Sequence, residues 1–292
     1  MSRLARTLRM IRVEHSVFAL PFALAGAWLA AGGVPRWTDL ALLVAAAVAA
    51  RSAAMAFNRL VDAPFDAANP RTAAREIPRG RISPAFAAGF TLACSIAFVG
   101  AAYLLAPLCG ALALPVLAVL LGYSYLKRWT WLCHAGLGLA LACAPAGAWL
   151  AVRKEFAPDW WLPLALGGGV LAWVAGFDLL YSLQDAEHDR RSGLRSFPAQ
   201  FGSRATLALS AVLFASALAL WAWTGHAASL RWPFWLGWSL VAGLLAAEQV
   251  LVRHGGLARV PTAFFTLNAW VGPVFFLGLA GALPGASVAQ VA

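Results

Sequence analysis

Long apolar stretches alternate with short polar segments along this chain of 292 residues. A helix that crosses a bilayer needs about 20 consecutive apolar residues, because each residue advances the helix by only about 1.5 Å. Nine stretches reach that length, and each predicts a transmembrane helix: residues 15–33, 39–59, 85–105, 108–126, 132–151, 161–182, 205–224, 233–252 and 262–282. The predicted fold class is an all-α, polytopic membrane protein.

The composition agrees with this pattern and limits the number of domains. Hydrophobic residues make up 62% of the chain, the mean hydropathy is +0.74, and 12% of residues are charged, whereas soluble domains average about 25% charged residues. Nine spans leave no room for a separate soluble domain, so we expect one transmembrane domain over residues 1–292. The arginine-rich start resembles a signal peptide, but eight further spans follow, and we expect the first span to be retained.

The basic residues lie mostly on one side of the predicted spans, and cytoplasmic loops carry such an excess. With a cytoplasmic N-terminus, that side holds seventeen of the 22 Lys and Arg residues, and Arg51 lies inside a span. The opposite side holds four, namely Arg36, Arg153, Lys154 and Arg231. The formal net charge of +10 therefore reflects topology and contact with anionic lipid, and we expect no nucleic-acid partner.

Acidic residues are concentrated at the ends of two spans. Five of the seven Asp residues fall in two short segments, Asn58-x-x-x-Asp62-x-x-x-Asp66 and Asp178-x-x-Tyr181-x-x-x-Asp185-x-x-x-Asp189. Acids are costly at a membrane boundary and usually mark a functional site there. Side chains four residues apart share one helix face. Solvated helix ends paired with nearby arginines are the simpler interpretation, but matched spacing on one side favours a site.

The two acidic segments indicate a repeated organisation. The second and sixth spans run in the same direction, so both segments emerge on the cytoplasmic side, and 123 residues separate Asp62 from Asp185 and Asp66 from Asp189. Polar, basic loops follow at residues 63–84 and 185–204, and such loops usually bind ligands. We expect two related four-helix halves and a ninth helix around a central cavity.

The residue types in these segments predict a phosphate and metal site. Mg²⁺ is held by a few carboxylates, keeps several waters and bridges to substrate phosphates. Nearby basic groups would neutralise a diphosphate, and the candidates are Arg71, Arg75, Arg79, Lys127 and Arg128. Metal and basic groups at a leaving oxygen lower the barrier to breaking a carbon–oxygen bond. Because the helices below are apolar, the predicted substrate is a prenyl diphosphate.

With these motifs, the chain resembles the UbiA superfamily of intramembrane aromatic prenyltransferases over nearly its whole length. The segment Arg12-Val13-Glu14-His15-Ser16-Val17-Phe18-Ala19-Leu20-Pro21-Phe22 is similar to the start of the branch that acts on 4-hydroxybenzoate and related quinone precursors. The segments Asn58-Arg59-Leu60-Val61-Asp62 and Gly193-Leu194-Arg195-Ser196-Phe197-Pro198-Ala199 are similar to that branch too. The pattern also resembles enzymes of the futalosine route to menaquinone, which would use a dihydroxynaphthoate.

The resemblance implies a mechanism and a location. Two Mg²⁺ ions, one per motif, would bind the diphosphate, and the implied ligands are Asn58, Asp62, Asp66, Asp185 and Asp189. Departure of diphosphate would leave an allylic carbocation that the aromatic acid attacks before losing a proton. Tyr181 would line the cation or hold a phosphate oxygen, and Asp178 would position the acceptor or help to remove its proton. The expected location is the bacterial cytoplasmic (inner) membrane, with the N-terminus and the active site facing the cytoplasm.

Several polar residues have two interpretations. Arg51 shares a face with Asn58 and either meets the acceptor's carboxylate or pairs with Asp178, and Asn58 alone would also suit a bond between helices. Lys127 and Arg128 alone would suit interfacial anchors. We expect His188 to face the surface. The sequence further suggests hydrogen bonds between helices for Glu248 and Asn268, and close helix packing for Gly167-Gly168-Gly169.

Two other functions are compatible with part of the pattern. An ion-coupled membrane transporter would use intramembrane acids, but it predicts charges near the midplane on broken helices, whereas these acids lie at one boundary. A member of the same superfamily with a different acceptor is the other alternative. The sequence does not indicate an oligomeric state.

Overall fold

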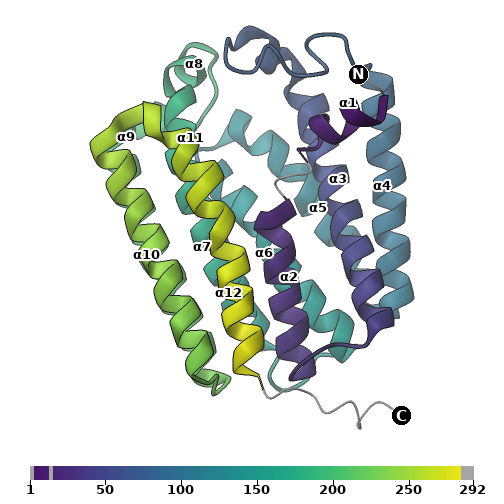
Figure 1. Cartoon of the computed structure of the whole chain (residues 1–292). Coiled ribbons are helices and arrows are strands. Elements are labelled where there is room, and N and C mark those ends of the chain that lie inside the picture. The colour runs from purple at the N-terminus through teal and green to yellow at the C-terminus, as the bar shows by residue number, and fades with distance from the viewer. Residues whose placement is uncertain (1–2, 13–15, 284–292) are drawn as a thin grey trace.

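The computed structural model describes residues 3–12 and 16–283, and this part of the chain contains helices and no strand. Its long helices stand side by side in one bundle (Figure 1). The α-helices are α1 (Arg3–Met10), α2 (Ser16–Ala31), α3 (Trp37–Ala68), α4 (Pro84–Leu105), α5 (Pro107–Trp129), α6 (Cys133–Arg153), α7 (Trp161–Ser182), α8 (Ala186–Arg191), α9 (Phe197–Ala227), α10 (Trp232–Gly255), α11 (Val260–Thr262) and α12 (Asn268–Ala282). Short 3₁₀ turns, η2 (Leu183–Asp185) and η3 (Gly256–Arg259), and a π-helical turn, η4 (Ala263–Leu267), interrupt the later helices.

The all-helical, multi-pass fold predicted from the sequence is confirmed. Among the described residues, eight helices are long and apolar enough to cross a membrane, and the apolar part of α2, Phe18–Ala31, is shorter. The first predicted span begins at residue 15, and residues 13–15, which include part of the N-terminal family segment, lie outside the described residues. Pro107 begins α5 directly after Ala106, so the third and fourth spans are separate helices.

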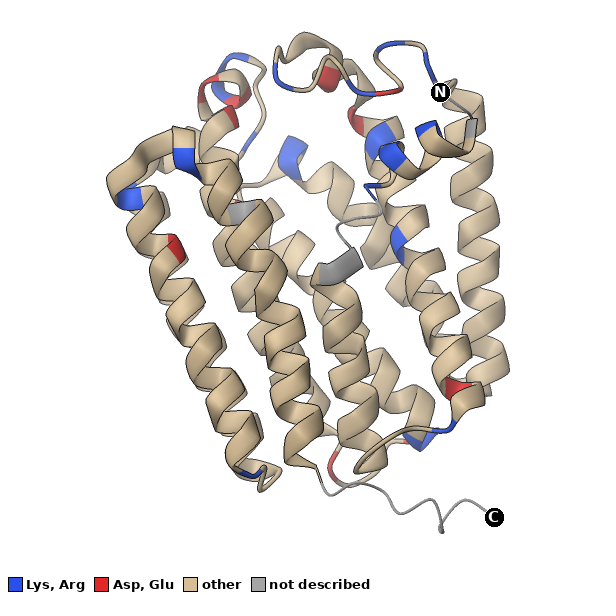
Figure 2. Cartoon of the chain, in the orientation of Figure 1, with Lys and Arg blue, Asp and Glu red and all other residues tan. Residues whose placement is uncertain are grey.

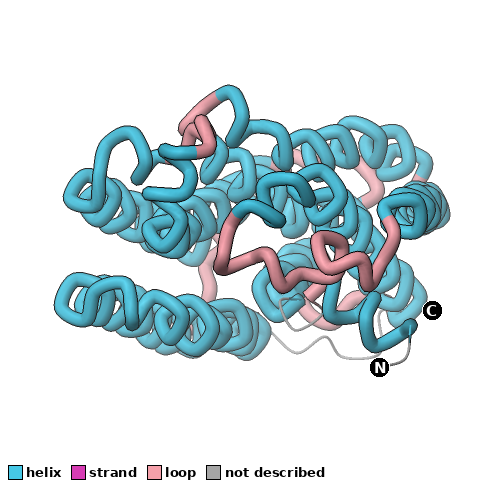
Figure 3. Tube along the Cα trace, turned by 90° about the horizontal axis from the view of Figure 1, so that it is seen from above, coloured by secondary structure: helices cyan, strands magenta, loops and turns pink. Residues whose placement is uncertain are grey.

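Both acidic segments are more helical than the predicted loops allowed. Helix α3 continues to Ala68, and the first motif lies on its last turns. Beyond α7, the turn η2 and the short helix α8 continue to Arg191. The sequence predicted that the loops begin at residues 63 and 185, and both boundaries were wrong. Acids spaced four residues apart are compatible with helix, so helical structure continues past both positions. The loop 69–83 crosses the end of the bundle when seen from above (Figure 3).

Most helices pack against their neighbours in the chain, and the division into two related halves stays a prediction. Helix α3 packs on α4 and α4 on α5, and in the second half α7 packs on α9 and α9 on α10. Helix α12 contacts both α10 and α2, and α2 also packs on α6. The last apolar stretch thus packs between helices from the start and the end of the chain.

Aromatic side chains fill the core between α2, α7, α9 and α12. Phe22 lies with ring centroids 5.2 Å from Trp173, 5.3 Å from Trp221 and 5.2 Å from Phe275. A Cβ added at Gly169 would lie 2.2 Å from Nε1 of Trp221. The prediction that the glycine run permits close packing is therefore confirmed at this position, since only a residue without a side chain leaves room for the indole.

Charged residues gather at one end of the bundle (Figure 2). That end carries α1, the loop 69–83 and α8, while few charged residues lie at the opposite end. Both acidic motifs lie at the charged end, as the direction of the second and sixth spans predicted. The fold thus brings together segments that are more than 100 residues apart in the sequence, and Arg71 bonds to Asp185 between them.

Candidate active site

A cavity of about 820 Å³ opens between the two acidic motifs and extends into the bundle. Twelve of the candidate site residues named from the sequence line it: Arg51, Asn58, Asp62, Asp66, Arg71, Arg75, Lys127, Arg128, Asp178, Tyr181, Asp185 and Asp189. Arg79 was also a candidate cation, but it is exposed on the loop and does not line the cavity. Deeper in the bundle its walls are mostly apolar, with side chains such as Leu43, Val116, Leu120 and Leu141. The cavity therefore joins a charged mouth to an apolar interior.

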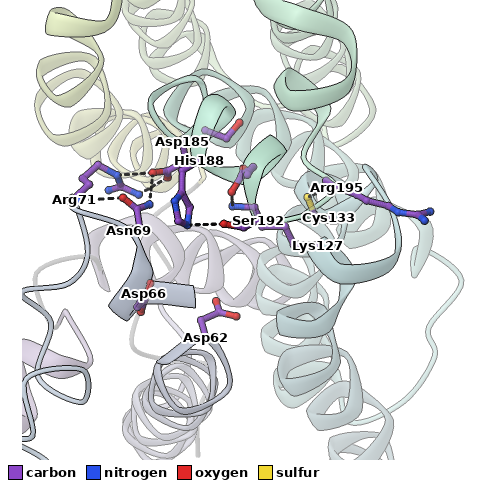
Figure 4. Close-up of polar contacts among 12 residues, drawn as sticks. Asp62, Asp66, Asn69, Arg71, Lys127, Cys133, Asp185, His188, Ser192 and Arg195 are labelled. Atoms are coloured by element: carbon purple, nitrogen blue, oxygen red, sulfur yellow. Dashed lines mark hydrogen bonds and ion pairs between the residues drawn. The ribbon is translucent and has the colours of Figure 1, made fainter. Parts of the chain in front are cut away.

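The first motif presents two carboxylates from the last turns of α3. The Asn58 amide donates to Oδ2 of Asp62 over 2.9 Å, one helical turn along. Arg75 reaches back from the loop and places Nη1 at 2.6 and 2.7 Å from the two oxygens of Asp66. Figure 4 shows Asp62 and Asp66 on one side of the site, with Asp185 and His188 on the other. Asp66 is paired with a charged guanidinium, whereas Asp62 accepts a hydrogen bond from a neutral amide.

A local turn aims Arg71 across the site. Helix α3 ends at Ala68, and Asn69 has extended backbone before Pro70, as proline requires of the residue that precedes it. The side-chain oxygen of Asn69 accepts from the Arg71 backbone N–H at 3.0 Å, which closes an Asx-turn. Thr72 Oγ1 donates to the Asp66 carbonyl at 3.1 Å. These bonds fix the direction in which the Arg71 side chain leaves the loop.

Arg71 and Asn69 connect the first motif to the second. Arg71 donates from Nε to Oδ1 of Asp185 at 2.8 Å and from Nη2 to Oδ2, so the pair is bidentate. It also donates to the Tyr181 hydroxyl at 2.9 Å, and the Asn69 amide donates to Oδ1 of Asp185 at 2.9 Å. Burial alone would lower the pKa of Arg71, but the hydrogen bonds and charge interactions with Asp185 and Tyr181 together outweigh burial, and the pKa is raised. Arg71 thus stays a cation at the mouth.

The second motif ends in a deeply buried carboxylate. Asp189 is 1% exposed, and the Lys127 ammonium lies 2.8 Å from its Oδ1. Oδ2 of Asp189 accepts no hydrogen bond from the described residues. The segment that follows α8 lies against the end of α5, where the Arg195 backbone N–H donates to the Lys127 carbonyl at 2.7 Å. A buried carboxylate oxygen without a partner is costly, and a bound ion or water is one way to satisfy it.

Two other predicted cations have main-chain partners. Arg128 donates to the Val61 carbonyl at 2.8 Å, and its guanidinium lies 5.1 Å from the ring centroids of both Phe65 and Tyr125. Arg51 donates to the carbonyls of Ile11 at 3.0 Å and Arg12 at 2.7 Å, which holds the end of α1. These bonds show that Arg128 and Arg51 also bind the backbone, a role that sequence reasoning missed.

Asp178, the ion-pair partner considered for Arg51, is bonded instead to His134. The Nδ1 atom of His134 lies 2.7 Å from Oδ2 of Asp178. His134 is 5% exposed and lines the cavity. Sequence reasoning missed it because a single histidine at the start of an apolar stretch belongs to no motif. Asn69 was missed as well, although Asn-Pro after an acidic helix end is a recognisable turn signal.

The structure corrects the prediction for His188 and confirms the one for Glu248 and Asn268. His188 lines the cavity instead of facing the surface, and its Nε2 lies 3.2 Å from the Ser192 hydroxyl. The turn η2 interrupts the α-helical period before α8, so faces counted from an ideal helix are shifted. Asn268 donates to Glu248 at 2.8 Å and accepts from the Trp173 indole at 2.9 Å, which ties α12 to α10 and α7.

The donor set at the mouth fits Mg²⁺. The four carboxylates expected to hold metal, those of Asp62, Asp66, Asp185 and Asp189, line the same cavity, and the unpartnered Oδ2 of Asp189 provides a buried anionic oxygen. Within the described residues no three carboxylate, imidazole or thiolate groups form a ready metal cluster. Two carboxylates per motif nonetheless suit an ion that keeps its waters and takes further oxygens from a substrate phosphate.

Comparison with known proteins agrees with this geometry. Residues 19–285 match the UbiA prenyltransferase family. The chain is 31% identical over 287 residues to a 4-hydroxybenzoate octaprenyltransferase of Cupriavidus necator, covering 96% of this chain and 98% of that protein. A UbiA homologue from Aeropyrum pernix K1, solved in its apo form, superposes with a TM-score of 0.84 at 34% identity, over 91% of this chain and 97% of that one.

A more distant UbiA homologue, from Archaeoglobus fulgidus and solved with DMAPP and Mg²⁺, shares the fold. Its TM-score is 0.69 at 18% identity, over 95% of this chain and 99% of that chain. Matches of sequence and fold over nearly the whole length agree with the convergence of both acidic motifs on one cavity. The chain belongs to the UbiA prenyltransferase family.

Proposed function

We propose that this protein transfers a polyprenyl group from a prenyl diphosphate to an aromatic acid, with Mg²⁺ required. The observation that carries the proposal is the single cavity that joins two acidic motifs and their cations to an apolar interior. A substrate with an anionic head and a hydrocarbon tail matches that division, because charge stays at the polar mouth while apolar surface is buried. Membership of a prenyltransferase family supports group transfer over ion-coupled transport.

The mouth would hold the diphosphate through metal and cations together. Asp62 and Asp66, with Asn58, would hold one Mg²⁺, and Asp185 and Asp189 a second. When bound, Mg²⁺ neutralises the diphosphate oxygens and stabilises the charge that develops on them. Arg71, Arg75 and Lys127 are within reach of the same carboxylates, and on substrate binding their charges would turn to the phosphate oxygens.

The acceptor would bind deeper than the diphosphate. We propose that Arg51 meets the carboxylate of the aromatic acid, because it lies inside the span of α3 and lines the cavity. Tyr181 would face the allylic carbon, and its hydroxyl already accepts from Arg71. We assign Arg128 mainly to holding the end of α3, given its bond to Val61. The relatives named 4-hydroxybenzoate octaprenyltransferase support 4-hydroxybenzoate over a dihydroxynaphthoate.

The reaction would proceed by ionisation and aromatic substitution. The carbon–oxygen bond of the prenyl diphosphate breaks and its electron pair leaves with the diphosphate, which Arg71, Arg75 and Lys127 hold. Apolar walls exclude water from the allylic cation. An electron pair of the hydroxyl-activated ring forms the new carbon–carbon bond. The proton on that ring carbon then leaves and the ring regains its aromaticity.

We also propose a setting for the protein. Residues 1–292 would form a single transmembrane domain in the bacterial inner membrane, within ubiquinone or menaquinone biosynthesis. The charged end would face the cytoplasm, because the excess of Lys and Arg on one side of the spans supports that orientation. The active site would then open toward the cytoplasm, where diphosphate is released.

The test is a product assay with purified protein. It would be incubated with Mg²⁺, labelled geranyl diphosphate, and either 4-hydroxybenzoate or a dihydroxynaphthoate. We expect a prenylated aromatic acid from 4-hydroxybenzoate, and loss of that product with Asp66→Asn or Asp189→Asn. Arg79→Ala is the matched control, since Arg79 is exposed and is not among the cavity-lining residues. No aromatic product with either acceptor would refute the proposal.

A further inference from the structure

A buried histidine and an aspartate form a hydrogen-bonded pair on the cavity wall. His134 lies in the first turn of α6, and Asp178 lies in α7 one turn before Tyr181. The two side chains meet at 2.7 Å between Nδ1 and Oδ2. Both residues line the cavity, yet the exposed fractions of their side chains are 6% for His134 and 24% for Asp178. The carboxylate therefore faces the cavity, and the imidazole supports it from behind.

A third group sets the tautomer of His134. The backbone N–H of Phe197, at the start of α9, donates to Nε2 of His134 over 3.3 Å. A ring nitrogen that accepts a hydrogen bond carries no proton, so the neutral imidazole carries its proton on Nδ1. That proton is donated to Oδ2 of Asp178. Nδ1 is therefore the ring nitrogen that faces Asp178, and Nε2 faces the Phe197 N–H.

We propose that His134 is a positioning residue that holds Asp178 as the proton acceptor of the reaction. The inference rests on the proposed function and deepens it. As the ring attacks the allylic cation, a carbon–carbon bond forms and the carbon–hydrogen bond at that ring carbon breaks. Its electron pair returns to the ring, and the proton passes to the free oxygen of Asp178. A base oriented by a third group is the arrangement that efficient proton transfer requires.

A purely structural role makes a different prediction. The same imidazole accepts from one of the first N–H groups of α9, which lack partners within the helix. His134 would then only tie α6 to α9, and Asp178 would be a bystander. Two substitutions separate these roles, because the side-chain amide of asparagine reaches the place of Nδ1 and that of glutamine reaches the place of Nε2.

The asparagine variant keeps the donor to Asp178 and the glutamine variant keeps the acceptor for Phe197. We expect His134→Asn to retain a kcat close to that of the wild type. We expect His134→Gln to lose about 100-fold in kcat, the lower end of what a positioned base contributes, with the KM for geranyl diphosphate and the thermal midpoint unchanged. The opposite order, with His134→Gln active and His134→Asn impaired, would overturn the proposal.

Two further measurements distinguish the loss of a positioned base from a general loss of structure. With ring-deuterated 4-hydroxybenzoate, His134→Gln is expected to show a primary isotope effect on kcat, because proton removal becomes slow. The double variant with Asp178→Asn is expected to lose no more than Asp178→Asn alone, since residues that act as a unit are not additive. Multiplicative losses without an isotope effect would assign His134 to structure only.

The wild-type protein in the same assay separates this inference from the proposed function. If the wild type makes no prenylated aromatic acid, the proposed function fails. If the wild type transfers the prenyl group and His134→Gln does so equally well, the positioning role fails alone. Should the glutamine variant not accumulate, His134→Asn decides: retained kcat supports the role, and a lost kcat at wild-type thermal stability overturns it.

Discussion

Replacing Arg71 by alanine is expected to strengthen metal binding and weaken catalysis at once. In the structure Arg71 holds Asp185 through Nε at 2.8 Å and through Nη2. A metal that binds Asp185 must displace this guanidinium. The same guanidinium would then serve the diphosphate. Its removal therefore has opposite effects on the two ligands.

The size of the first effect follows from the geometry. Hydrogen bonds to charged groups contribute about 1.5–3 kcal/mol each. The side chain of Arg71 is 31% exposed and that of Asp185 is 9% exposed, so solvent screening places the pair near the lower end, at about 2 kcal/mol. About 2 kcal/mol corresponds to roughly 30-fold in a binding constant. We expect Mn²⁺, used as a spin probe for Mg²⁺, to bind up to that much more tightly without prenyl substrate.

The second effect concerns the reaction. Removal of one preorganised donor from developing negative charge costs about 100–1,000-fold in kcat, and we expect kcat/KM for geranyl diphosphate to fall by that order. Paramagnetic resonance would measure Mn²⁺ binding, and labelled product would measure turnover. Arg79→Ala is the matched loop control and should change neither. Weaker Mn²⁺ binding in Arg71→Ala, or unchanged turnover, would refute the assignment of Arg71 to both ligands.

Three further outcomes are expected. Gly169→Ala would destabilise the protein by about 1–3 kcal/mol through overpacking, since its Cβ would lie 2.2 Å from Nε1 of Trp221. Gly147→Ala is the matched control: open space surrounds that position and alanine favours the helix, so the thermal midpoint in detergent should not fall. Asn268→Leu would leave the buried Glu248 without its donor at a cost of about 1–3 kcal/mol, seen as a lower thermal midpoint; an unchanged midpoint would contradict the structural role of that bond. Chelation of divalent metal should abolish prenyl transfer and added Mg²⁺ should restore it, and activity that survives chelation would argue against metal at the motifs.

The candidate site was largely predictable because its residues form local patterns. Asn58, Asp62 and Asp66 recur at four-residue intervals, which places them on one face of a single helix. Asp185 and Asp189 repeat that interval at the end of another span. Counting spans placed both motifs at one end of the bundle, and the structure places them on one cavity. Such features depend on helical period and on the thickness of the membrane, and both act locally along the chain.

Partners across the site were not predictable in the same way. No local pattern links Arg71 to Asp185, or His134 to Asp178 and Phe197. The turn η2 also moved His188 into the cavity, because a 3₁₀ turn advances the chain by a different angle than an α-helix. Long-range contacts of this kind depend on how helices pack, and many packings satisfy the same apolar pattern.

The sequence by itself therefore determined the class of protein, the helices, and the two acidic motifs with their chemistry. Hydrophobic length and side-chain spacing are sufficient for these, since each segment must satisfy its own backbone in the membrane. Only the tertiary structure decided which cation holds which carboxylate, that Arg51 holds the end of α1, and that a histidine supports Asp178. Those pairings arise where separate helix ends meet, and the free energy of each depends on distances that only the packed bundle sets.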